Sequence, residues 1–437
     1  MGGTRRGGGF LPSLCARGNF GGVRNEGSSP VAPSGAFTDS ASSRGSTGNS
    51  RTRVLLAATV LCYVTLYGPQ PLLPLFREQY ALTTAGAGLI ITLAMLPLSL
   101  GPIAYGQLLA RAAPQLILRA GLVALGLGSV ALTIAGSYPL VLGIRTLQGL
   151  LLPAILTTIA ARIAAESHET GIRRALSGYV AATVAGGLSG RLLAGILSAL
   201  GSWRLFFILV GVLLFAVAAC LRPAGGTPVH PAQTGSATLR SLVANRRCMG
   251  IFVTAFCVFL VFSGLLNVLP FRVTQLSRMT AEWYRGAVYA GYTMGFAASL
   301  GSQRLTRLVG GERPVVLLGH GVLAAALLLT LVAELSVLFA TVFLLCGAVF
   351  LIHATVAGHI NRLGRGQENG VNGLYLSSYY CGGVLGSFGA GVILDTWGWP
   401  ALITVFLAVV CVSVVGVLGG LSNTEVRPDG AGYDRDR

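Results

Sequence analysis

Two arginines lie inside apolar stretches, where a permanently charged side chain needs a reason. Arg145 stands in "LVLGIRTLQGLLLPAI" (140–155), three residues before Gln148, and Arg191 stands in "GGLSGRLLAGILSALGSW" (186–203). At the centre of a bilayer a guanidinium costs at least ~2.5 kcal/mol unless it faces protein or a water-filled cavity. The surrounding stretches contain no Asp or Glu at this depth. Two buried cations without a carboxylate partner indicate a cavity that receives an anion.

A second interpretation of Arg145 is a side chain that reaches the nearer membrane surface. That surface lies roughly six residues away, or about 9 Å along a helix. This distance is too long for the charged head to stay hydrated. We therefore favour an Arg145 that faces a cavity, with Gln148 beside it.

Further polar and aromatic residues lie in other apolar stretches. Gln70 stands between prolines in "YGPQPLLPLF", which is typical either of a broken helix whose free carbonyls line a cavity or of a frayed end at the surface. Aromatic residues at helical spacing are more often core than site, and Tyr375 and Tyr379 share one helix face. The remaining candidates for the cavity are Tyr63, Tyr67, Asn267, Tyr375 and Tyr379.

Proton transport needs a group that titrates near neutral pH, and no carboxylate is expected near the bilayer midplane. His353 lies in the inner half of the tenth apolar stretch, and an ordinary histidine pKa of ~6.5 suits a proton carrier. The alternative is a structural histidine that is hydrogen-bonded within the bundle. His353 or His359 could also serve as the base of an intramembrane enzyme or sensor, but a catalytic base needs an orienting partner and this stretch contains no carboxylate.

The composition is that of a membrane protein. Of 437 residues, 53% are hydrophobic and 10% are charged, with a mean hydropathy of +0.72. Apolar runs long enough to cross ~30 Å of hydrocarbon recur along the chain, which predicts an all-α, multi-pass protein. We expect twelve membrane-spanning helices at roughly 54–76, 85–108, 117–135, 139–164, 176–199, 203–221, 249–270, 285–302, 314–333, 337–359, 370–393 and 398–420.

The basic residues predict the orientation of these helices. The chain contains no lysine, and its arginines concentrate in the connections that follow even-numbered spans. Both termini are therefore expected in the cytoplasm, and all four tryptophans then fall at the outer interface. In this context the net charge of +17 indicates membrane topology and not nucleic-acid binding.

An internal repeat divides the chain into two halves. Shifting the sequence by 196 residues aligns 186–203 with "GGVLGSFGAGVILDTWGW" (382–399), and it also aligns Arg111 with Arg307 and Pro74 with Pro270. Because the shift covers six spans, both copies enter the membrane from the same side. Two parallel six-helix halves with a substrate site between them near the midplane are expected.

The expected domains follow from the repeat and from the polar segments. Residues 51–221 and 248–421 form the two six-helix halves, and the Pro- and Gly-rich residues 222–247 form a cytoplasmic linker. Residues 1–50 and 422–437 are expected to be disordered cytoplasmic tails.

Several motifs resemble those of the major facilitator superfamily over roughly residues 51–421. "RTLQG" (145–149) is similar to the arginine motif R-x-x-Q-G of the fourth span, and "GGLSGRLLAG" (186–195) resembles the glycine-rich fifth-span motif of drug:proton antiporters. "LYLSSYYCGGVLG" (374–386) and "LNVLPFRV" (266–273) are similar to the bacterial arabinose-efflux-like branch. The resemblance implies that these glycines form a flexible seam between the halves, at Gly186, Gly187, Gly190, Gly382, Gly383 and Gly386. Their close spacing alone predicts helix packing.

One family motif departs from its usual form. The pattern G-x-L-a-D-R after the second span reads "GQLLARAAPQ" (106–115), in which Gly106 and Arg111 are present and Ala110 replaces the aspartate. The second copy, "SQRLTRLVGG" (302–311), keeps Arg307 but has Thr306 at the aspartate position. In the family this aspartate helps to close the cytoplasmic ends of the halves against a helix N-terminus. We expect this closure to be weakened or replaced.

These observations predict a secondary transporter of the cytoplasmic membrane that works by alternating access. The resemblance implies export of a small organic molecule or drug in exchange for protons, by a monomer, without a cofactor or metal. An importer of a small organic or inorganic anion is the alternative that Arg145 and Arg191 suggest. A phosphate-binding loop of the type G-x-x-x-x-G-K-[ST] requires a lysine, so ATP hydrolysis by this chain is excluded.

Overall fold

The computed structural model describes residues 39–109, 113–166, 172–221, 236–277, 283–363 and 368–421. Every secondary-structure element in these ranges is a helix, which confirms the all-α prediction for the described residues. From Thr47 onward the chain forms one compact unit. Of the predicted tail 1–50, residues 1–38 lie outside the described residues, and so does the predicted tail 422–437. Residues 39–50 are helical and form the beginning of α1.

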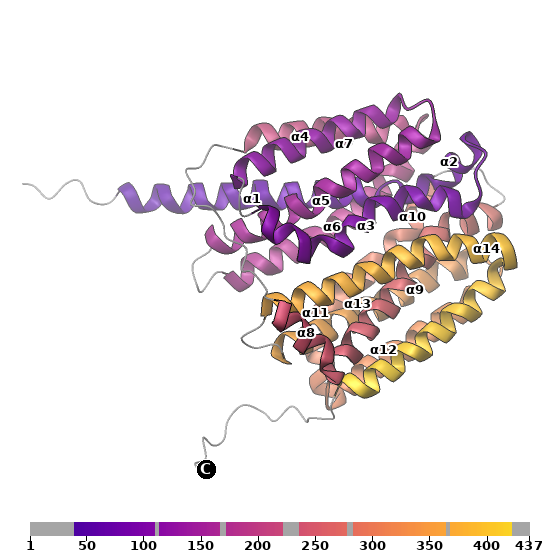
Figure 1. Ribbon diagram of the computed structural model, residues 1–437. Coiled ribbons are helices and arrows are strands. Elements are labelled where there is room, and N and C mark those ends of the chain that lie inside the picture. The colour runs from indigo at the N-terminus through magenta and orange to yellow at the C-terminus, as the bar shows by residue number, and fades with distance from the viewer. Residues whose placement is uncertain are drawn as a thin grey trace, which may run out of the picture. The chain divides into compact units, whose positions relative to one another are not determined.

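The first half begins with α1 (Asp39–Tyr67), η1 (Gln70–Leu72) and α2 (Leu73–Gln79). It continues with α3 (Thr84–Leu109), α4 (Pro114–Thr133), α5 (Tyr138–Glu166), α6 (Ile172–Ala199) and α7 (Arg204–Cys220). Figure 1 shows α4 and α7 next to each other, in agreement with the contacts between them.

The second half is preceded by α8 (Ser236–Ala244), which lies within the predicted linker. The helices that follow are α9 (Arg246–Leu276), α10 (Trp283–Ala287), η2 (Val288–Gly291), α11 (Tyr292–Val309), α12 (Glu312–Leu329), α13 (Leu335–Leu363) and α14 (Glu368–Gly420). Helix α9 begins after Asn245, whose side chain accepts hydrogen bonds from the backbone N–H groups of Arg247 and Cys248.

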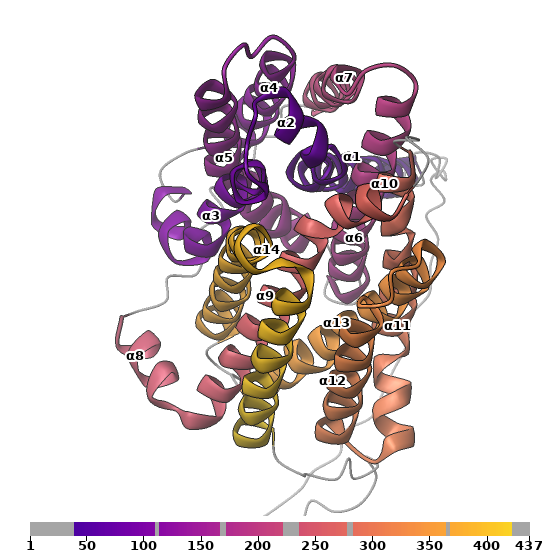
Figure 2. The same cartoon turned by 90° about the vertical axis from the view of Figure 1, so that its right-hand side faces the viewer.

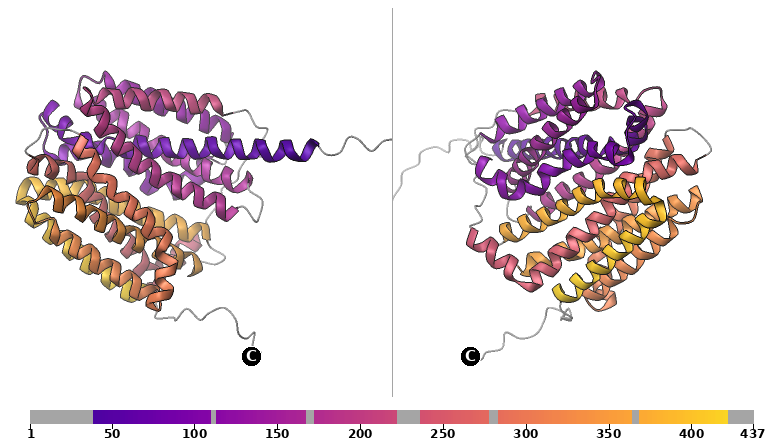
Figure 3. Two further views of the ribbon diagram at one scale, coloured as in Figure 1. Left: turned by 180° about the vertical axis from the view of Figure 1, so that it is seen from behind. Right: turned by 45° about the vertical axis from the view of Figure 1, so that its right-hand side comes forward.

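The helix boundaries follow the 196-residue repeat. Shifting α5 by 196 residues gives 334–362, and α13 occupies Leu335–Leu363. In Figure 3 the helices of the first half (indigo to magenta) form one group and those of the second half (orange to yellow) form another. The predicted all-helical architecture of two halves related by the repeat is confirmed for the described residues.

Among the described residues, nine helical stretches are long and apolar enough to cross a membrane. One of them, Gly370–Gly420, contains two crossings, because Gly398 has φ 77° and ψ −177° and reverses the chain direction. Two further helices have 17 residues (α7) and 18 residues (α11). This arrangement is consistent with the twelve predicted spans.

The first span is interrupted, whereas its counterpart in the repeat is continuous. Pro69 and Pro71 have no N–H to continue α1, which ends at Tyr67 and is followed by the single turn η1. In the second half α9 runs without a break through Pro270. Gln70 is only 1% exposed, so the alternative of a frayed end at the surface is wrong.

The two halves contact each other along α3 and α14, where α14 lies beside α9 (Figure 2). A Cβ on Gly391 would lie 2.6 Å from the Cα of Ala85, and one on Gly383 would lie 2.8 Å from the sulfur of Met95. We call the end of the helix bundle at which α14 ends the terminal face, and the opposite end, which carries the connection between α2 and α3 and the bend within α14, the far face (Figure 1).

Candidate functional site

Arg145 on α5 is fully buried and holds the broken end of α1. Its guanidinium donates to the carbonyls of Thr65 (2.9 Å), Leu66 (2.9 Å) and Ile90 (3.0 Å), and to the Gln148 side chain (2.8 Å). The carbonyl of Thr65 is available because the residue four positions later is Pro69, which has no N–H. Arg145 is therefore not the unpaired cation that the sequence predicts, and a contact between Arg145 and solute stays a prediction.

Gln148 extends this arrangement to α4. Its amide nitrogen donates to the carbonyl of Leu125 and the hydroxyl of Ser129, both at 3.2 Å. The next residue, Gly149, contacts α3 so closely that a Cβ would lie 2.6 Å from the carbonyl oxygen of Ala94. The R-x-x-Q-G motif thus joins α1, α3, α4 and α5 within the first half.

Arg191 on α6 belongs to a polar network that crosses between the halves. Its Nε donates to Gln70 Oε1 at 2.6 Å, and its Nη1 donates to the carbonyl of Gly187 at 2.6 Å. Gln70 Nε2 lies 3.4 Å from Asn267 Oδ1 on α9, and Asn267 Nδ2 donates to the carbonyl of Ser387 at 3.0 Å. The predicted candidates Arg191, Gln70 and Asn267 are therefore brought together.

The direction of this network is set by Arg191. A guanidinium can only donate, so the side-chain oxygen of Gln70 must face Arg191 and its nitrogen must face Asn267. Asn267 then presents its oxygen to Gln70 and its nitrogen to α14. The orientation of both amides follows from the hydrogen bonds and needs no separate assignment.

Three tyrosine rings enclose the guanidinium of Arg191. Its central carbon lies 4.5 Å from the ring centroid of Tyr67, 5.1 Å from that of Tyr289 and 4.7 Å from that of Tyr292. Tyr289 is fixed by its hydroxyl, which donates to the carbonyl of Leu266 at 2.8 Å. Tyr67 is a predicted candidate, whereas Tyr289 and Tyr292 come from the other half and were missed.

Further aromatic residues continue from this cage at the interface of the halves. The hydroxyls of Tyr63 on α1 and Tyr380 on α14 lie 3.1 Å apart and join the two halves. Tyr379 stacks on Phe259 with a centroid distance of 3.8 Å. Tyr380 was missed, although its neighbour Tyr379 was among the predicted residues. The candidate tyrosines thus lie in one aromatic cluster with both core and interface contacts.

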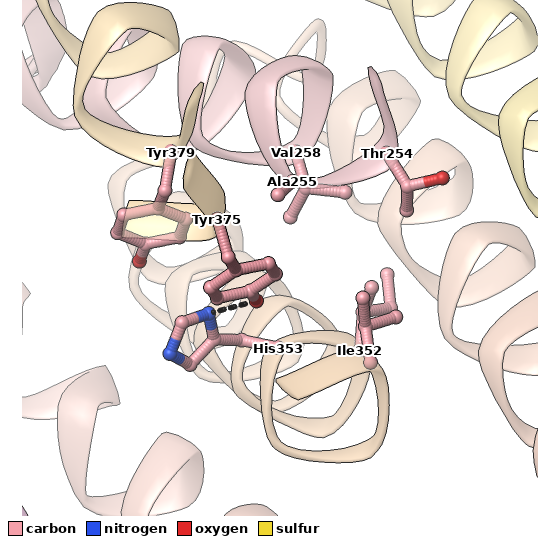
Figure 4. Close-up of a pocket in the computed structure, with 8 residues that line it drawn as sticks. Thr254, Ala255, Val258, Ile352, His353, Tyr375 and Tyr379 are labelled. Atoms are coloured by element: carbon pink, nitrogen blue, oxygen red, sulfur yellow. Dashed lines mark hydrogen bonds between the residues drawn. The ribbon is translucent and has the colours of Figure 1, made fainter. Parts of the chain in front are cut away.

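His353 lies beside this cluster, in the second half. Its Nδ1 is 2.9 Å from the hydroxyl of Tyr375, and its ring centroid is 4.7 Å from that of Tyr379 (Figure 4). A shallow pocket that is too narrow to hold a water molecule lies here between α9, α13 and α14. Its lining residues are Thr254, Ala255, Val258, Ile352, His353, Val356, Tyr375 and Tyr379. The structure therefore groups His353 with two of the predicted cavity residues.

The far face is closed by contacts that the sequence did not predict. The carboxylate of Asp395 on α14 accepts a hydrogen bond of 2.9 Å from the backbone N–H of Ala85, in the first turn of α3. Nearby, α6 meets α10, where a Cβ on Gly195 would lie 2.7 Å from the Cα of Gly286. Both contacts join the first half to the second.

The regular spacing of the motif glycines serves helix packing. A Cβ on Gly190 would lie 2.8 Å from the Cα of Val64, and one on Gly186 would lie 2.8 Å from the Cβ of Tyr63. Gly382 and Gly386 lie in the same way against the backbone of α9, at Phe256 and Leu260. The small residues therefore allow close contact of α6 with α1 and of α14 with α9. Their part in movement between the halves stays a prediction.

The motif residues at the terminal face are described only in part. Arg111 and Ala110 lie outside the described residues, and Gly106 lies near the C-terminal end of α3. Arg307 lies in the last turn of α11, and the Thr306 hydroxyl donates to the carbonyl of Ser302 at 2.9 Å within the same helix.

His359 has a carboxylate partner that the sequence analysis did not expect. Glu312, the first residue of α12, lies 2.5 Å from His359 Nδ1 and also pairs with Arg362. The tenth span itself contains no carboxylate, as its sequence shows, and the partner of His359 comes from the neighbouring helix α12. The partner was missed because it lies 47 residues earlier, on the neighbouring helix.

Comparisons with known proteins identify the class. The sequence profile described as Major Facilitator Superfamily matches residues 55–363, and the chain belongs to this family. The inner membrane transport protein YnfM of Escherichia coli (strain K12) is 24% identical over 357 residues, which cover 80% of this chain and 85% of that protein. The uncharacterized MFS-type transporter YybF of Bacillus subtilis (strain 168) is 20% identical over 389 residues, covering 86% of this chain and 95% of that protein.

A solved structure shares the fold. A bacterial homologue of the human lysosomal transporter Spinster, in an inward-facing and occupied conformation, superposes with a TM-score of 0.64 at 16% identity. The match covers 84% of this chain and 93% of that chain. The protein is therefore a multi-pass membrane transporter that works by alternating access, and not an enzyme.

Proposed function

We propose that this transporter exports a small organic molecule across the cytoplasmic membrane in exchange for protons, as a monomer. The motifs that resemble the drug:proton antiporters and the arabinose-efflux-like branch support this direction. The main support is the buried network of Arg191, Gln70 and Asn267, because it is polar, lies between the halves and involves both of them. A polar site between two rocking halves is what alternating access requires.

The proposed orientation places the terminal face in the cytoplasm. The arginine-rich connections support it, since arginines accumulate in cytoplasmic loops. With this orientation the contacts at Asp395 and at Gly195 close the protein toward the outside. In the proposed orientation, the structure would therefore be the state in which the substrate site exchanges solute with the cytoplasm.

His353 is the proposed proton carrier. It lies on the membrane-spanning helix α13 next to the aromatic cluster, and its partner is the neutral hydroxyl of Tyr375. A histidine with a neutral partner can gain and lose a proton without breaking an ion pair. Protonation would place a cation against Tyr375 and Tyr379, in the second half, and would change the contacts that this half makes.

The experiment compares two substitutions of His353 in proteoliposomes. His353→Gln keeps a polar side chain that can bond to Tyr375 but cannot titrate, and His353→Ala removes both functions. If His353 carries the proton, both variants lose solute export driven by a proton gradient and keep exchange of labelled solute at equal concentrations. Gradient-driven export by the His353→Gln variant would contradict the proposal and leave His353 a structural residue.

Uptake of an organic or inorganic anion is the second candidate function. It is favoured by Arg191, which contacts an amide, a carbonyl and three rings and forms no ion pair among the described residues. The same vesicles distinguish uptake from export, because the gradient that drives accumulation has the opposite direction in the two cases.

A further inference from the structure

Among the described residues, two arginines are fully buried, on the consecutive helices α5 and α6, and their hydrogen-bond partners differ in kind. Arg145 donates four hydrogen bonds, three of them to backbone carbonyls that cannot leave their helices. Arg191 donates to the side chain of Gln70 and to the carbonyl of Gly187 on its own helix, and otherwise faces tyrosine side chains. Arg145 is therefore held mainly by the backbone of other helices, whereas the contacts of Arg191 with other elements are all to neutral side chains.

The partners of Arg191 do not balance its charge. Within the described residues no carboxylate pairs with it, and its side chain is only 1% exposed. The faces of the tyrosine rings carry partial negative charge, which stabilises a guanidinium less than a carboxylate does. A buried cation that is held in this way is a site for an anion that arrives from elsewhere.

We infer that the substrate is an organic anion, a carboxylate or similar oxyanion on an aromatic or apolar body, and that its charged group replaces Gln70 as the acceptor for Arg191. This inference rests on the proposed transport function and specifies the substrate of the same site. The rings of Tyr67, Tyr289 and Tyr292 surround the guanidinium and suit an aromatic body. Arg191 suits an oxyanion because its planar group can bind two oxygens at once.

The exchange of acceptors also couples binding to movement. Gln70 bonds to Arg191 on its own half and to Asn267 on the other half. A charged acceptor binds a guanidinium more strongly than the neutral amide does. When the substrate anion takes this place, Gln70 is released, and its bond across the interface to Asn267 is released with it. Substrate binding thereby weakens one link that holds the halves together.

The first test needs no substrate. Gln70→Glu places a carboxylate next to Arg191 and imitates the bound anion. Gln148→Glu is the matched control, because it makes the same change beside Arg145, four of whose five N–H donors already have acceptors. Gln70→Glu gives up one long amide bond, to Asn267 at 3.4 Å, whereas Gln148→Glu gives up two, to Leu125 and Ser129 at 3.2 Å. At pH 7.5 we expect Gln70→Glu to raise the unfolding midpoint of the purified full-length protein by about 2–4 °C. The Gln148→Glu midpoint is expected to fall.

The second test uses three probes that share one aromatic body, 1-naphthoate, neutral 1-naphthamide and cationic 1-naphthylmethylamine, at millimolar concentration. We expect 1-naphthoate alone to raise the midpoint of the wild type, and Gln70→Glu to abolish this rise because its own carboxylate occupies Arg191. An equal or larger shift with the amide or the amine would overturn the inference. A naphthoate shift that survives in the Gln70→Glu variant would also overturn it.

If none of the probes shifts the unfolding midpoint of the wild type, the midpoint of the Gln70→Glu variant decides whether Arg191 is an anion site. A higher midpoint for Gln70→Glu then supports an anion site at Arg191, and an unchanged or lower midpoint overturns it. Neither measurement involves a proton gradient. Anion binding without gradient-driven export would therefore contradict the proposed proton coupling but keep the organic anion as the substrate class. Gradient-driven export of neutral or cationic solutes alone would contradict the anionic substrate but keep the proton coupling.

Discussion

Asp395 is the position at which a small change should alter the balance between the two open states of the transporter. Its carboxylate binds the N–H of Ala85, and Thr83 caps the same turn of α3 through a bond to the N–H of Gly86. The first turn of a helix carries unpaired N–H groups and partial positive charge, so a carboxylate from the other half is held there by both effects. Asp395 is itself exposed, which weakens the interaction.

The expected shift between the two states follows from the charge of Asp395 and from its hydrogen bond, which two substitutions separate. Asp395→Asn keeps an oxygen acceptor and removes the charge, which is worth about 0.3–1 kcal/mol at an exposed helix N-terminus. The ratio of far-face-open to far-face-closed molecules should then rise about two- to fivefold. Asp395→Ala also removes the hydrogen bond, worth about 1 kcal/mol, and should raise the ratio roughly fivefold more.

The ratio is measurable from the distance between two spin labels at the far face. Glu78 in the first half and Val332 in the second are exposed and provide attachment sites after replacement of the native cysteines. The population at the longer distance should grow in the order wild type, Asp395→Asn, Asp395→Ala.

Glu334→Gln is the matched control for this series, since it removes one negative charge from the connection between α12 and α13, at the same face. The control should give the wild-type distance distribution. Wild-type distributions in the Asp395 variants would show that the bond to α3 does not hold the far face closed. A shift with Glu334→Gln as large as that with Asp395→Asn would contradict the same role, because the effect would then come from net charge and not from the bond to α3.

Three further predictions concern packing, the arginine clamp and topology. Arg145→Lys should lower the unfolding midpoint and transport together, because an ammonium cannot reach α1, α3 and Gln148 at once; a variant with wild-type midpoint and transport would contradict the clamp. Gly386→Ala should destabilise the protein by about 1–3 kcal/mol in thermal unfolding, because its Cβ would overlap the backbone of α9. Gly389→Ala, where a Cβ meets nothing within 4 Å, should be nearly neutral. A reporter fused after Arg247 should be cytoplasmic and one inserted near Arg278 periplasmic, and the reverse result would overturn the proposed orientation.

The fold could be predicted from the sequence because its signals repeat. Length and hydropathy give the spans, and the 196-residue offset gives the two parallel halves, whose helices agree with the predicted ranges to within a few residues in most cases. The expected spans 370–393 and 398–420 leave a short connection at 394–397, directly before the bend that the structure has at Gly398. The spans and the two halves depend on the composition of many residues, so an error at one position changes the predicted fold little.

The partners of the buried arginines could not be predicted in the same way. The depth of Arg145 is visible in the sequence, but its partners are backbone carbonyls, and every residue has one. The only local signal was Pro69, which removes an N–H and frees the carbonyl of Thr65. For Arg191 the decisive rings of Tyr289 and Tyr292 are about a hundred residues away, on the other half, and a single sequence does not show which residues meet across that interface.

The acidic residue that binds a helix N-terminus of the other half lies at a different face in this chain than in the family motif. The family motif places an aspartate at the terminal face, where this sequence has Ala110 and Thr306. A carboxylate bound to a helix N-terminus is present instead at the far face, through Asp395 and α3. Because the interaction stabilises only the state in which that face is closed, its location decides which state it favours. The bond from Asp395 to α3 therefore favours the state in which the far face is closed, whereas the usual aspartate of the family motif would favour closure of the terminal face.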